Sequence, residues 1–363
     1  MSRVGTFEVS TNSKIELYVG NITEIKNYDV LVISAIPGNY VPTPGSVIGA
    51  LHRDLKLSVA ELSKNKEEVC KVFSSWWSKR LNKLPMNRIL CYEGNFRNPM
   101  RSIAEVFGTL IALGNNDITV AMPLLASGDQ KYSKEDMMRI IFNASTCWMQ
   151  VGFPIKLLKI VVYARDVYNL DASALSLCKM FAFLTTTSWR MSLLKQPQER
   201  YDIYMSYNFK DKFLANEIVK ICENLHNGIR IKHPQYINEI EVWQEEIYKA
   251  IVRSSCVIAL ISSEYLNDSS CIEQFNIALC SSRYQNSGDL FIFYVSEISL
   301  PTYMGFHGFF DCRQGYEKVM NACKDVCRSI FGSTDIVLCP DPVESNEVLI
   351  PVEHDEMLVL KSV

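Results

Sequence analysis

Residues 201–207 read YDIYMSY, and further along the chain CVIALIS (256–262) is followed directly by SEYLNDSSCIEQF (263–275). The first two runs are short, apolar and rich in β-branched or aromatic residues, as is typical of strands buried in a parallel sheet. Between them, apolar residues recur at helical spacing in two places, residues 214–225 and 243–251. Strands that alternate with helices predict an α/β domain, here with a five-stranded parallel sheet.

The first half of the chain carries the same alternation. Its apolar, β-branched runs predict buried strands at residues 15–19, 29–35, 88–92, 118–122 and 158–163. Helical spacing of apolar residues lies between the later runs, as in Ile103, Phe107, Leu110 and Ile111. We therefore expect a mostly parallel sheet with helices on both faces, which is a three-layer α/β/α domain.

The length of 363 residues and the 48% of hydrophobic residues suit two domains with proper cores. A polar stretch, LLKQPQERYD (193–202), separates the two alternating series. We expect domains at residues 1–190 and 201–331, joined by a linker at 191–200. The tail at 332–363 has seven acidic residues against one Lys and an apolar MLVL. It is either a docking segment or a loosely ordered terminus with an edge strand.

Charge and cysteine usage narrow the class of protein further. The net charge of −3 and the pI near 6.0 give no general attraction to nucleic acid or to anionic lipid. No apolar run approaches the ~20 residues that span a bilayer, so we expect no membrane partner. The twelve cysteines are scattered through apolar segments without a CxxC pair. This usage favours a reducing compartment, and we expect a cytoplasmic protein.

Three segments of the second half resemble the TIR (Toll/interleukin-1 receptor) domain, over roughly residues 200–331. They are YDIYMSY with Asp211 following, WQEEIYKAIVRSSCVIALISSEYL (243–266) and GFFDC (308–312). The resemblance implies a flavodoxin-like fold. It also implies either docking onto other TIR domains, with homo-oligomers on activation, or hydrolysis of NAD. The segment HPQYINEIE (233–241) lacks the Arg-Asp-x-x-Pro-Gly run of many receptor TIR domains, which puts receptor-like docking in doubt.

The candidate catalytic position is altered. TIR domains that cleave NAD place a Glu three residues after a Cys, whereas here Gln274 lies three residues after Cys271 and Glu273 comes one place earlier. Cleavage of the nicotinamide–ribose bond builds positive charge on the ribose, which a carboxylate stabilises and an amide does not fully replace. One residue along a helix rotates a side chain by ~100°. Glu273 is therefore either the catalytic carboxylate or a solvated one near a helix N-terminus.

The resemblance and the fold class suggest further NAD-binding residues. Ser206, Asn208 and Asp211 follow the first strand of the second domain, at the sheet edge where open α/β folds bind ligands. Asp211 is alternatively a helix N-cap. Three aromatic residues are alternatively stacking partners for a nicotinamide or adenine ring or packing residues of the core: Trp243, Tyr236 and Tyr265. Gln274 completes this predicted set.

The first half resembles macro domains, which bind ADP-ribose and related nucleotides, over about residues 7–183. The resemblance rests on VGNIT (19–23) with DVLV (29–32), TPGSVIGALH (43–52) and MPLLASGDQKY (122–132). It implies an ADP-ribose-like ligand, no tightly bound cofactor, and a site made by Asn21, Gly45, Gly49, Ser127 and Gly128. Asn21 replaces the adenine-binding Asp of the family. Glycines let backbone N–H groups approach a phosphate, although such loops are alternatively ordinary turns.

Together these features predict an intracellular signalling protein of innate-defence or stress type that binds nucleotides of the NAD family. NAD cleavage by the TIR domain and a catalytically inert TIR adaptor are the main alternatives. A third is an ADP-ribose hydrolase with the TIR domain as its targeting device. It is disfavoured because SAIPGNY (34–40) replaces the Asn-Ala-Ala-Asn run of macro hydrolases. No metal-ligand set stands out among the five histidines.

Overall fold

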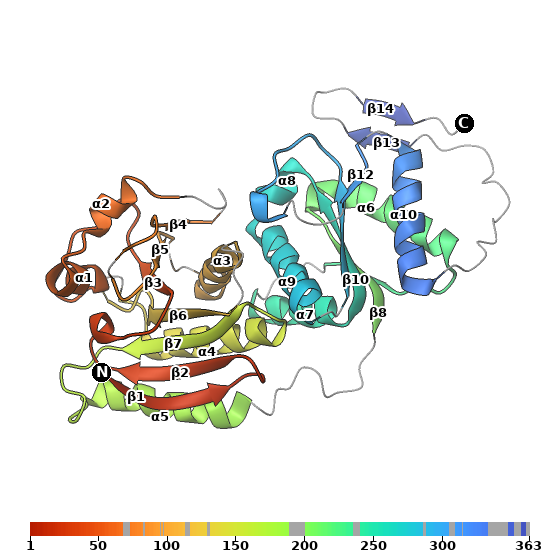
Figure 1. Ribbon diagram of the computed structural model, residues 1–363. Helices are drawn as coiled ribbons and strands as arrows, with labels where there is room; N and C mark the ends of the chain where they lie inside the picture. Colours follow the sequence, from red (N-terminus) through yellow and green to blue (C-terminus); the bar gives the residue numbers. More distant parts are fainter. Residues whose placement is uncertain are drawn as a thin grey trace. The chain divides into compact units, whose positions relative to one another are not determined.

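The computed structural model describes most of the chain. The described residues are 1–67, 73–82, 84–94, 96, 98–112, 117–128, 131–188, 200–234, 240–285, 288–304, 309–313, 315–332, 348–351 and 357–360. The chain divides into two compact units, the first covering Met1–Gln196 and the second beginning at Pro197. Each unit has its own sheet (Figure 1).

The first unit is built on a seven-stranded sheet of order β1-β2-β7-β6-β3-β5-β4. Its strands are β1 (Ser2–Glu8), β2 (Lys14–Val19), β3 (Val30–Ser34), β4 (Ser75–Trp77), β5 (Arg88–Tyr92), β6 (Ile118–Pro123) and β7 (Ile155–Val162). The five inner strands are parallel, and they are the five that the apolar runs predicted. The two edge strands, β1 and β4, pair antiparallel with their neighbours. The prediction of a mostly parallel sheet is therefore confirmed.

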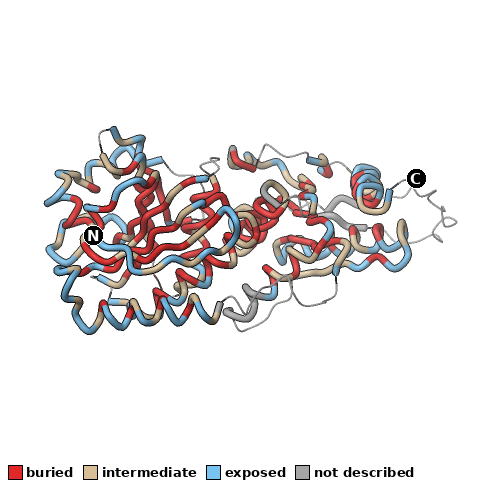
Figure 2. Tube along the Cα trace, turned by 60° about the horizontal axis from the view of Figure 1, so that its bottom comes forward, coloured by how far each residue is buried: buried red, intermediate tan, exposed pale blue. Residues whose placement is uncertain are grey.

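Helices cover both faces of this sheet. They are η1 (Ile22–Glu24), α1 (Val47–Leu55), α2 (Val59–Ser63), α3 (Pro99–Ile111), α4 (Lys134–Gln150) and α5 (Ala172–Ser188). Leu51 of α1 and Val59 of α2 pack with Leu31 and Ile33 of β3 in one core cluster. A second core joins α3, α4 and α5 through contacting aromatic rings, among them Phe107, Phe142, Trp148, Phe153 and Phe181. Figure 2 shows much of this sheet as buried, whereas the edge strand β1 has no buried residue.

The second unit has a five-stranded sheet of order β12-β11-β10-β8-β9, in which every pair is parallel. Its strands are β8 (Tyr201–Ser206), β9 (Ile231–Lys232), β10 (Ser254–Ile261), β11 (Asp289–Tyr294) and β12 (Phe309–Asp311). This is the α/β domain with a five-stranded parallel sheet that the sequence predicted. The apolar run predicted at residues 256–262 lies in the central strand, β10. Every residue from Cys256 to Ile261 is buried.

The helices of the second unit follow the predicted apolar faces. They are η3 (Phe209–Asp211), α6 (Lys212–Leu225), α7 (Ile240–Val252), α8 (Ser263–Leu266), α9 (Ser269–Gln285), η4 (Thr302–Met304) and α10 (Tyr316–Phe331). Ile218 and Ile221 of α6 pack with Cys323 and Val326 of α10 against the sheet. A two-stranded antiparallel hairpin, β13 (Val348–Pro351) and β14 (Met357–Leu360), lies in the C-terminal tail. Its role as a docking segment stays a prediction.

None of the helices in the described part of the chain combines the length and the apolar character that a bilayer-spanning helix needs.

Candidate functional site

A cleft of about 550 Å³ opens at the carboxyl ends of the first unit's parallel strands. We call it the glycine-loop cleft. It collects the segments that follow β2, β3, β6 and β7, because the carboxyl ends of parallel strands meet at one edge of the sheet. Four of the five predicted nucleotide-binding residues of this unit line it: Asn21, Gly45, Ser127 and Gly128.

The first loop of the cleft, residues 43–46, leads into α1. Ser46 caps this helix, since its Oγ accepts a hydrogen bond from the N–H of Gly49 at 3.0 Å. The N–H groups of Gly45, Val47 and Ile48 have no acceptor among the described residues. Free N–H groups at a helix N-terminus suit an anion such as a phosphate.

Gly49 is not among the described residues that line the cleft, and its role in binding a ligand stays a prediction. It lies beneath the first loop, where a Cβ atom would be 1.8 Å from the carbonyl oxygen of Thr43. The residue is a glycine because the backbone of the loop passes directly over the helix. Gly45 differs, since no atom lies within 4 Å of the position its Cβ would take.

The second loop of the cleft, residues 124–128, faces the first. The nearest atom to a Cβ built on Gly128 is the carbonyl oxygen of Gly45, at 3.8 Å. Ser127 donates its hydroxyl to the carbonyl of Leu124 at 2.6 Å, and the N–H of Ala126 donates to Ser34 Oγ at 3.1 Å. The second bond ties the loop to the end of β3. The two glycine loops therefore approach each other from opposite sides of the cleft.

Asn21 is held in one orientation. Its Oδ1 accepts from the N–H of Thr23 at 3.2 Å, and its Nδ2 donates to Asp54 Oδ2 at 2.7 Å. Thr23 Oγ1 donates to the same carboxylate oxygen at 2.8 Å. The hydrogen bonds from Asn21 and Thr23 hold the pKa of the Asp54 carboxyl below its usual value. The Asn21 amide is thus positioned by the protein before any ligand arrives.

The walls of the cleft combine apolar and cationic side chains. Ile36, Val41 and Tyr163 line it and are 48%, 65% and 69% exposed. The other wall residues include three cations, which come from α1, from the start of α4 and from the segment after β7. Among the described lining residues there is no carboxylate, imidazole or thiol.

In the second unit, Gln274 lies in a buried hydroxyl cluster that also contains Tyr204, Ser206 and Tyr265. Gln274 Oε1 accepts from Tyr204 Oη at 3.2 Å and from Ser206 Oγ at 2.9 Å. Ser206 Oγ and Tyr265 Oη lie 2.7 Å apart and share a further hydrogen bond. Burial raises the pKa of the Tyr204 and Tyr265 hydroxyls well above the usual value. We call these four residues the Gln274 cluster. The sequence had suggested Tyr265 as a ring-stacking partner, but its ring is fully buried.

Glu273 lies on another side of α9. Its Oε1 accepts a hydrogen bond from Tyr248 Oη of α7 at 3.0 Å, and the residue is 7% exposed. The alternative of a solvated carboxylate is therefore wrong. The hydrogen bond directs the carboxylate toward α7, whereas Gln274 meets the hydroxyls at the end of β8. The structure thus separates the two neighbouring side chains into two environments.

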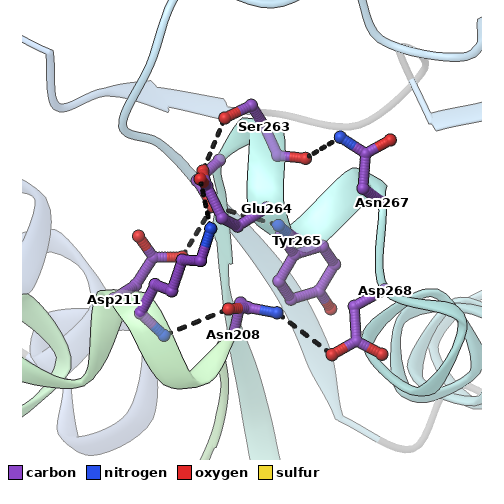
Figure 3. Close-up of polar contacts among 9 residues, drawn as sticks. Asn208, Asp211, Ser263, Glu264, Tyr265, Asn267 and Asp268 are labelled. Carbon is purple, nitrogen blue, oxygen red and sulfur yellow. Dashed lines mark hydrogen bonds and ion pairs between the residues drawn. The ribbon is translucent and has the colours of Figure 1, made fainter. Parts of the chain in front are cut away.

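Asn208 and Asp211 lie at the same sheet edge, in a polar network with the loop after β10 (Figure 3). Asn208 Nδ2 donates to Asp268 Oδ2 at 3.0 Å, and Asp211 Oδ2 accepts from Ser262 Oγ at 2.6 Å. Asp211 occupies the N-cap position of α6 but makes no capping hydrogen bond with its side chain. Burial raises the pKa of the Asp211 carboxyl. Both predicted ligand-binding side chains therefore already have protein partners.

Two aromatic candidates cannot be placed beside this network. Trp243 belongs to α7, but its side chain lies outside the described residues, and Tyr236 lies outside them altogether. Across the described part of the chain, no group of three or more His, Cys, Asp and Glu side chains could hold a metal ion.

Parts of the chain are similar to known proteins. Residues 203–323 match the family model described as the TIR domain. No curated protein matches the chain.

Solved structures similar to the chain include macrodomains. A mutant of the Oceanobacillus iheyensis macrodomain is 18% identical, with a TM-score of 0.39, and the match covers 51% of this chain and 99% of that one. Another mutant of that macrodomain, solved with ADPR, is 17% identical over 50% of this chain and 99% of that one, with a TM-score of 0.39. A Trypanosoma brucei macrodomain in complex with ADP is 16% identical over 48% and 71%, with a TM-score of 0.37. Residues 203–323 of the chain are therefore similar to the TIR domain.

Proposed function

We propose that this protein is a cytoplasmic signalling protein of innate-defence or stress type. Its glycine-loop cleft binds an ADP-ribose-type nucleotide, and its TIR domain acts by assembling with other TIR domains into homo-oligomers. The cytoplasmic assignment is supported by the ten described cysteines, which are all free thiols. The TIR assignment is supported by the family match over residues 203–323.

One observation carries the nucleotide proposal. The N–H groups of Gly45, Val47 and Ile48 are free at the start of α1, and the second glycine loop faces them across the cleft. Free N–H groups at a helix N-terminus bind phosphate, so the gap between the loops suits a diphosphate. The exposed Ile36, Val41 and Tyr163 offer apolar contact to the sugar and base of the same ligand.

The absence of turnover in the first unit is part of this proposal. Hydrolysis of an ADP-ribose bond needs a group that activates water or the leaving oxygen. The described walls of the cleft contain no carboxylate, imidazole or thiol, which leaves Lys134 and Tyr163 as their titratable groups other than arginine. The nucleotide would therefore act as a signal that the cleft recognises and not as a substrate that it consumes.

The inert-adaptor reading of the TIR domain is supported by the Gln274 cluster. At the end of β8 the hydroxyls of Tyr204 and Ser206 meet an amide oxygen, which carries a dipole and no full charge. Positive charge on a ribose would gain little from it. The sequence of residues 233–241 puts receptor-like docking through this segment in doubt. Assembly would therefore use other surfaces of the TIR domain.

NAD cleavage is a second candidate because Glu273 is a buried carboxylate one residue away, beside Tyr248. Buried carboxylates are frequent at catalytic sites. To act on a ligand at the end of β8, Glu273 would have to leave Tyr248 and turn around α9. Under this reading Glu273→Ala abolishes nicotinamide release from NAD, whereas Gln274→Ala changes it less. Equal release by both variants would exclude Glu273 as the catalytic group.

The nucleotide proposal is tested by titrating the full-length protein with ADP-ribose, and with adenosine as the control without phosphate. We expect ADP-ribose to bind and adenosine to bind much more weakly. Gly45→Leu should abolish binding by filling the cleft, while its melting temperature stays near the wild-type value because no atom lies within 4 Å of the added Cβ. A wild-type protein that does not bind ADP-ribose would overturn the proposal.

Assembly is tested by sedimentation of the full-length protein with and without NAD, alongside the nicotinamide assay. The adaptor reading expects assembly without NAD consumption. Nicotinamide release that depends on Glu273 would exclude the adaptor reading and support NAD cleavage by the TIR domain.

A further inference from the structure

We propose that Cys222 and Cys327 of the second unit are a modification site, at which a hydroperoxide converts the two thiols into a disulfide. Cys222 lies in the last turn of α6, and Cys327 lies in the last two turns of α10. Both belong to the core cluster in which these helices pack against the sheet. The inference does not depend on the proposed nucleotide binding.

A pair of stacked rings sets the register between the two helices. His226 directly follows the end of α6, and Phe331 is the last residue of α10. Their ring centroids lie 3.7 Å apart, with an angle of 7° between the ring planes. Each helix follows a strand of the same all-parallel sheet, so the two helices run in the same direction. One helical turn back from each ring therefore places Cys222 opposite Cys327.

The thiols at this level of the core interact with one another. The Cys222 thiol contacts the thiols of Cys323 and Cys327, which are one turn apart on the same face of α10. Contact with Cys222, together with burial, raises the pKa of the Cys327 thiol. The contacts between the thiols agree with the register that the stacked rings set.

Helix packing of this kind gives a separation that a disulfide can span. Packed helices have axes about 8 to 10 Å apart, and each Cα atom lies about 2.3 Å from its axis. Cα atoms that face each other directly are then about 3.4 to 5.4 Å apart. The usual Cα separation in disulfides is about 4.4 to 6.8 Å, so the two ranges overlap.

Exposure decides which thiol meets the peroxide first. Cys327 is 9% exposed, whereas Cys222 and Cys323 are both 0% exposed. Helix ends fray, so opening of the last turns of α10 uncovers Cys327 before a thiol that lies deeper in the core. The raised pKa keeps the Cys327 thiol protonated and slow to react while the fold is closed. We therefore expect oxidation to be slow and to proceed through this local opening.

The reaction is a two-electron oxidation in two steps. The Cys327 sulfur attacks the O–O bond of the peroxide, which breaks to leave a sulfenic acid on Cys327 and, with hydrogen peroxide, releases water. The Cys222 sulfur then displaces the sulfenic oxygen, which leaves as a second water and carries the Cys222 proton. Two thiols thus give two electrons and two protons to one peroxide. A reducing compartment reverses the cross-link by thiol exchange, so the disulfide forms only when peroxide rises.

The test is peptide mass spectrometry of the full-length protein after treatment with hydrogen peroxide. The remaining thiols are alkylated in denaturant, and the protein is digested with trypsin without reduction. Because trypsin cuts at Lys324, Cys323 and Cys327 fall in different peptides, and Cys222 lies in a third. We expect the Cys222 peptide to be linked to the Cys327 peptide. Addition of a dithiol reductant before alkylation should remove the link.

The cross-link should also stabilise the second unit. It closes a loop of about 100 residues in the unfolded chain, so oxidation should raise the melting temperature of this unit by about 5 to 15 °C. Cys222→Ser and Cys327→Ser should each abolish both the link and the rise. Cys312→Ser is the matched control, because Cys312 is a buried thiol of the same core cluster that lies on neither helix. It should retain both effects.

Three results would overturn the inference. They are free thiols at Cys222 and Cys327 after treatment, oxidation of Cys327 to a sulfinic or sulfonic acid without a link, and a link from Cys222 to any other cysteine. The peptide map of the wild type decides among these results even if a serine variant fails to fold. None of them bears on nucleotide binding, which the titration with ADP-ribose tests separately.

Discussion

Replacing Gly49 with alanine tests whether tight packing of the first loop on α1 shapes the glycine-loop cleft. The new Cβ would lie 1.8 Å from the carbonyl oxygen of Thr43 and 2.8 Å from its carbonyl carbon, whereas real contacts essentially never fall below 3.0 Å. The loop would have to retreat by about 1.2 Å, the difference between 3.0 and 1.8 Å. Both atoms belong to the backbone, so no side-chain rotation relieves the contact.

The expected loss of stability follows from two opposing effects. Overpacking of this kind costs about 1 to 3 kcal/mol. Alanine is a better helix former than glycine and returns up to about 1 kcal/mol. We expect a net loss of about 1 to 2 kcal/mol in the free energy of unfolding, which lowers the melting temperature of a unit of this size by about 2 to 8 °C.

The assay is differential scanning calorimetry of the full-length protein, followed by titration with ADP-ribose. Gly49→Ala should melt earlier and bind more weakly, because the displaced loop carries the free N–H group of Gly45. Gly45→Ala is the matched control, since its Cβ meets open space and its backbone is not left-handed. It should melt at or slightly above the wild-type temperature. A Gly49→Ala protein with wild-type stability and affinity would refute the packing argument.

Three further substitutions have expected outcomes. Burial raises the pKa of the Asp211 carboxyl in the folded state above its usual value, so the folded state binds more protons and the free energy of unfolding falls as the pH rises through this range. Asp211→Asn should remove that fall and be more stable than the wild type at neutral pH, as measured by urea unfolding at several pH values. Ser46→Ala removes the cap of α1 and should cost about 1 kcal/mol of unfolding free energy, whereas no change would show that the cap is dispensable. Gln274→Leu leaves Tyr204 without its recorded acceptor and Ser206 with one partner fewer, and it should cost about 1 to 3 kcal/mol in the same unfolding assay. A Gln274→Leu protein as stable as the wild type would show that these hydroxyls find other partners.

Inner strands were predictable from the sequence, and edge strands were not. The run at residues 256–262 is apolar throughout because parallel inner strands are buried on both faces, and that pattern is visible without a structure. The edge strand β1 has no buried residue, and most of its residues are exposed, so its sequence lacks the apolar run that marks the inner strands. The edge strand β4 has three residues, too few for any periodicity.

The candidate sites were predictable only where local sequence decides them. Gly45 and Gly128 were expected in loops after strands, and the structure brings these two loops together. The sequence does not show whether a glycine at residue 49 is needed for contact with a ligand or for close packing against another backbone segment. The contact of Gly49 with the backbone of Thr43 could therefore not be predicted. The hydroxyls around Gln274 come from β8 and α8, far apart in the chain, and only the fold assembles them.

The shared acceptor of the Gln274 cluster has an evolutionary consequence. The codons of glutamine and glutamate differ by one nucleotide, and the two side chains have nearly the same shape. The hydroxyls of Tyr204 and Ser206 donate toward an oxygen that either side chain presents at this point. A lineage could therefore gain or lose a carboxylate here in one mutational step, without redesigning the neighbours. The hydroxyl groups around residue 274 therefore do not indicate whether glutamine or glutamate was the ancestral residue.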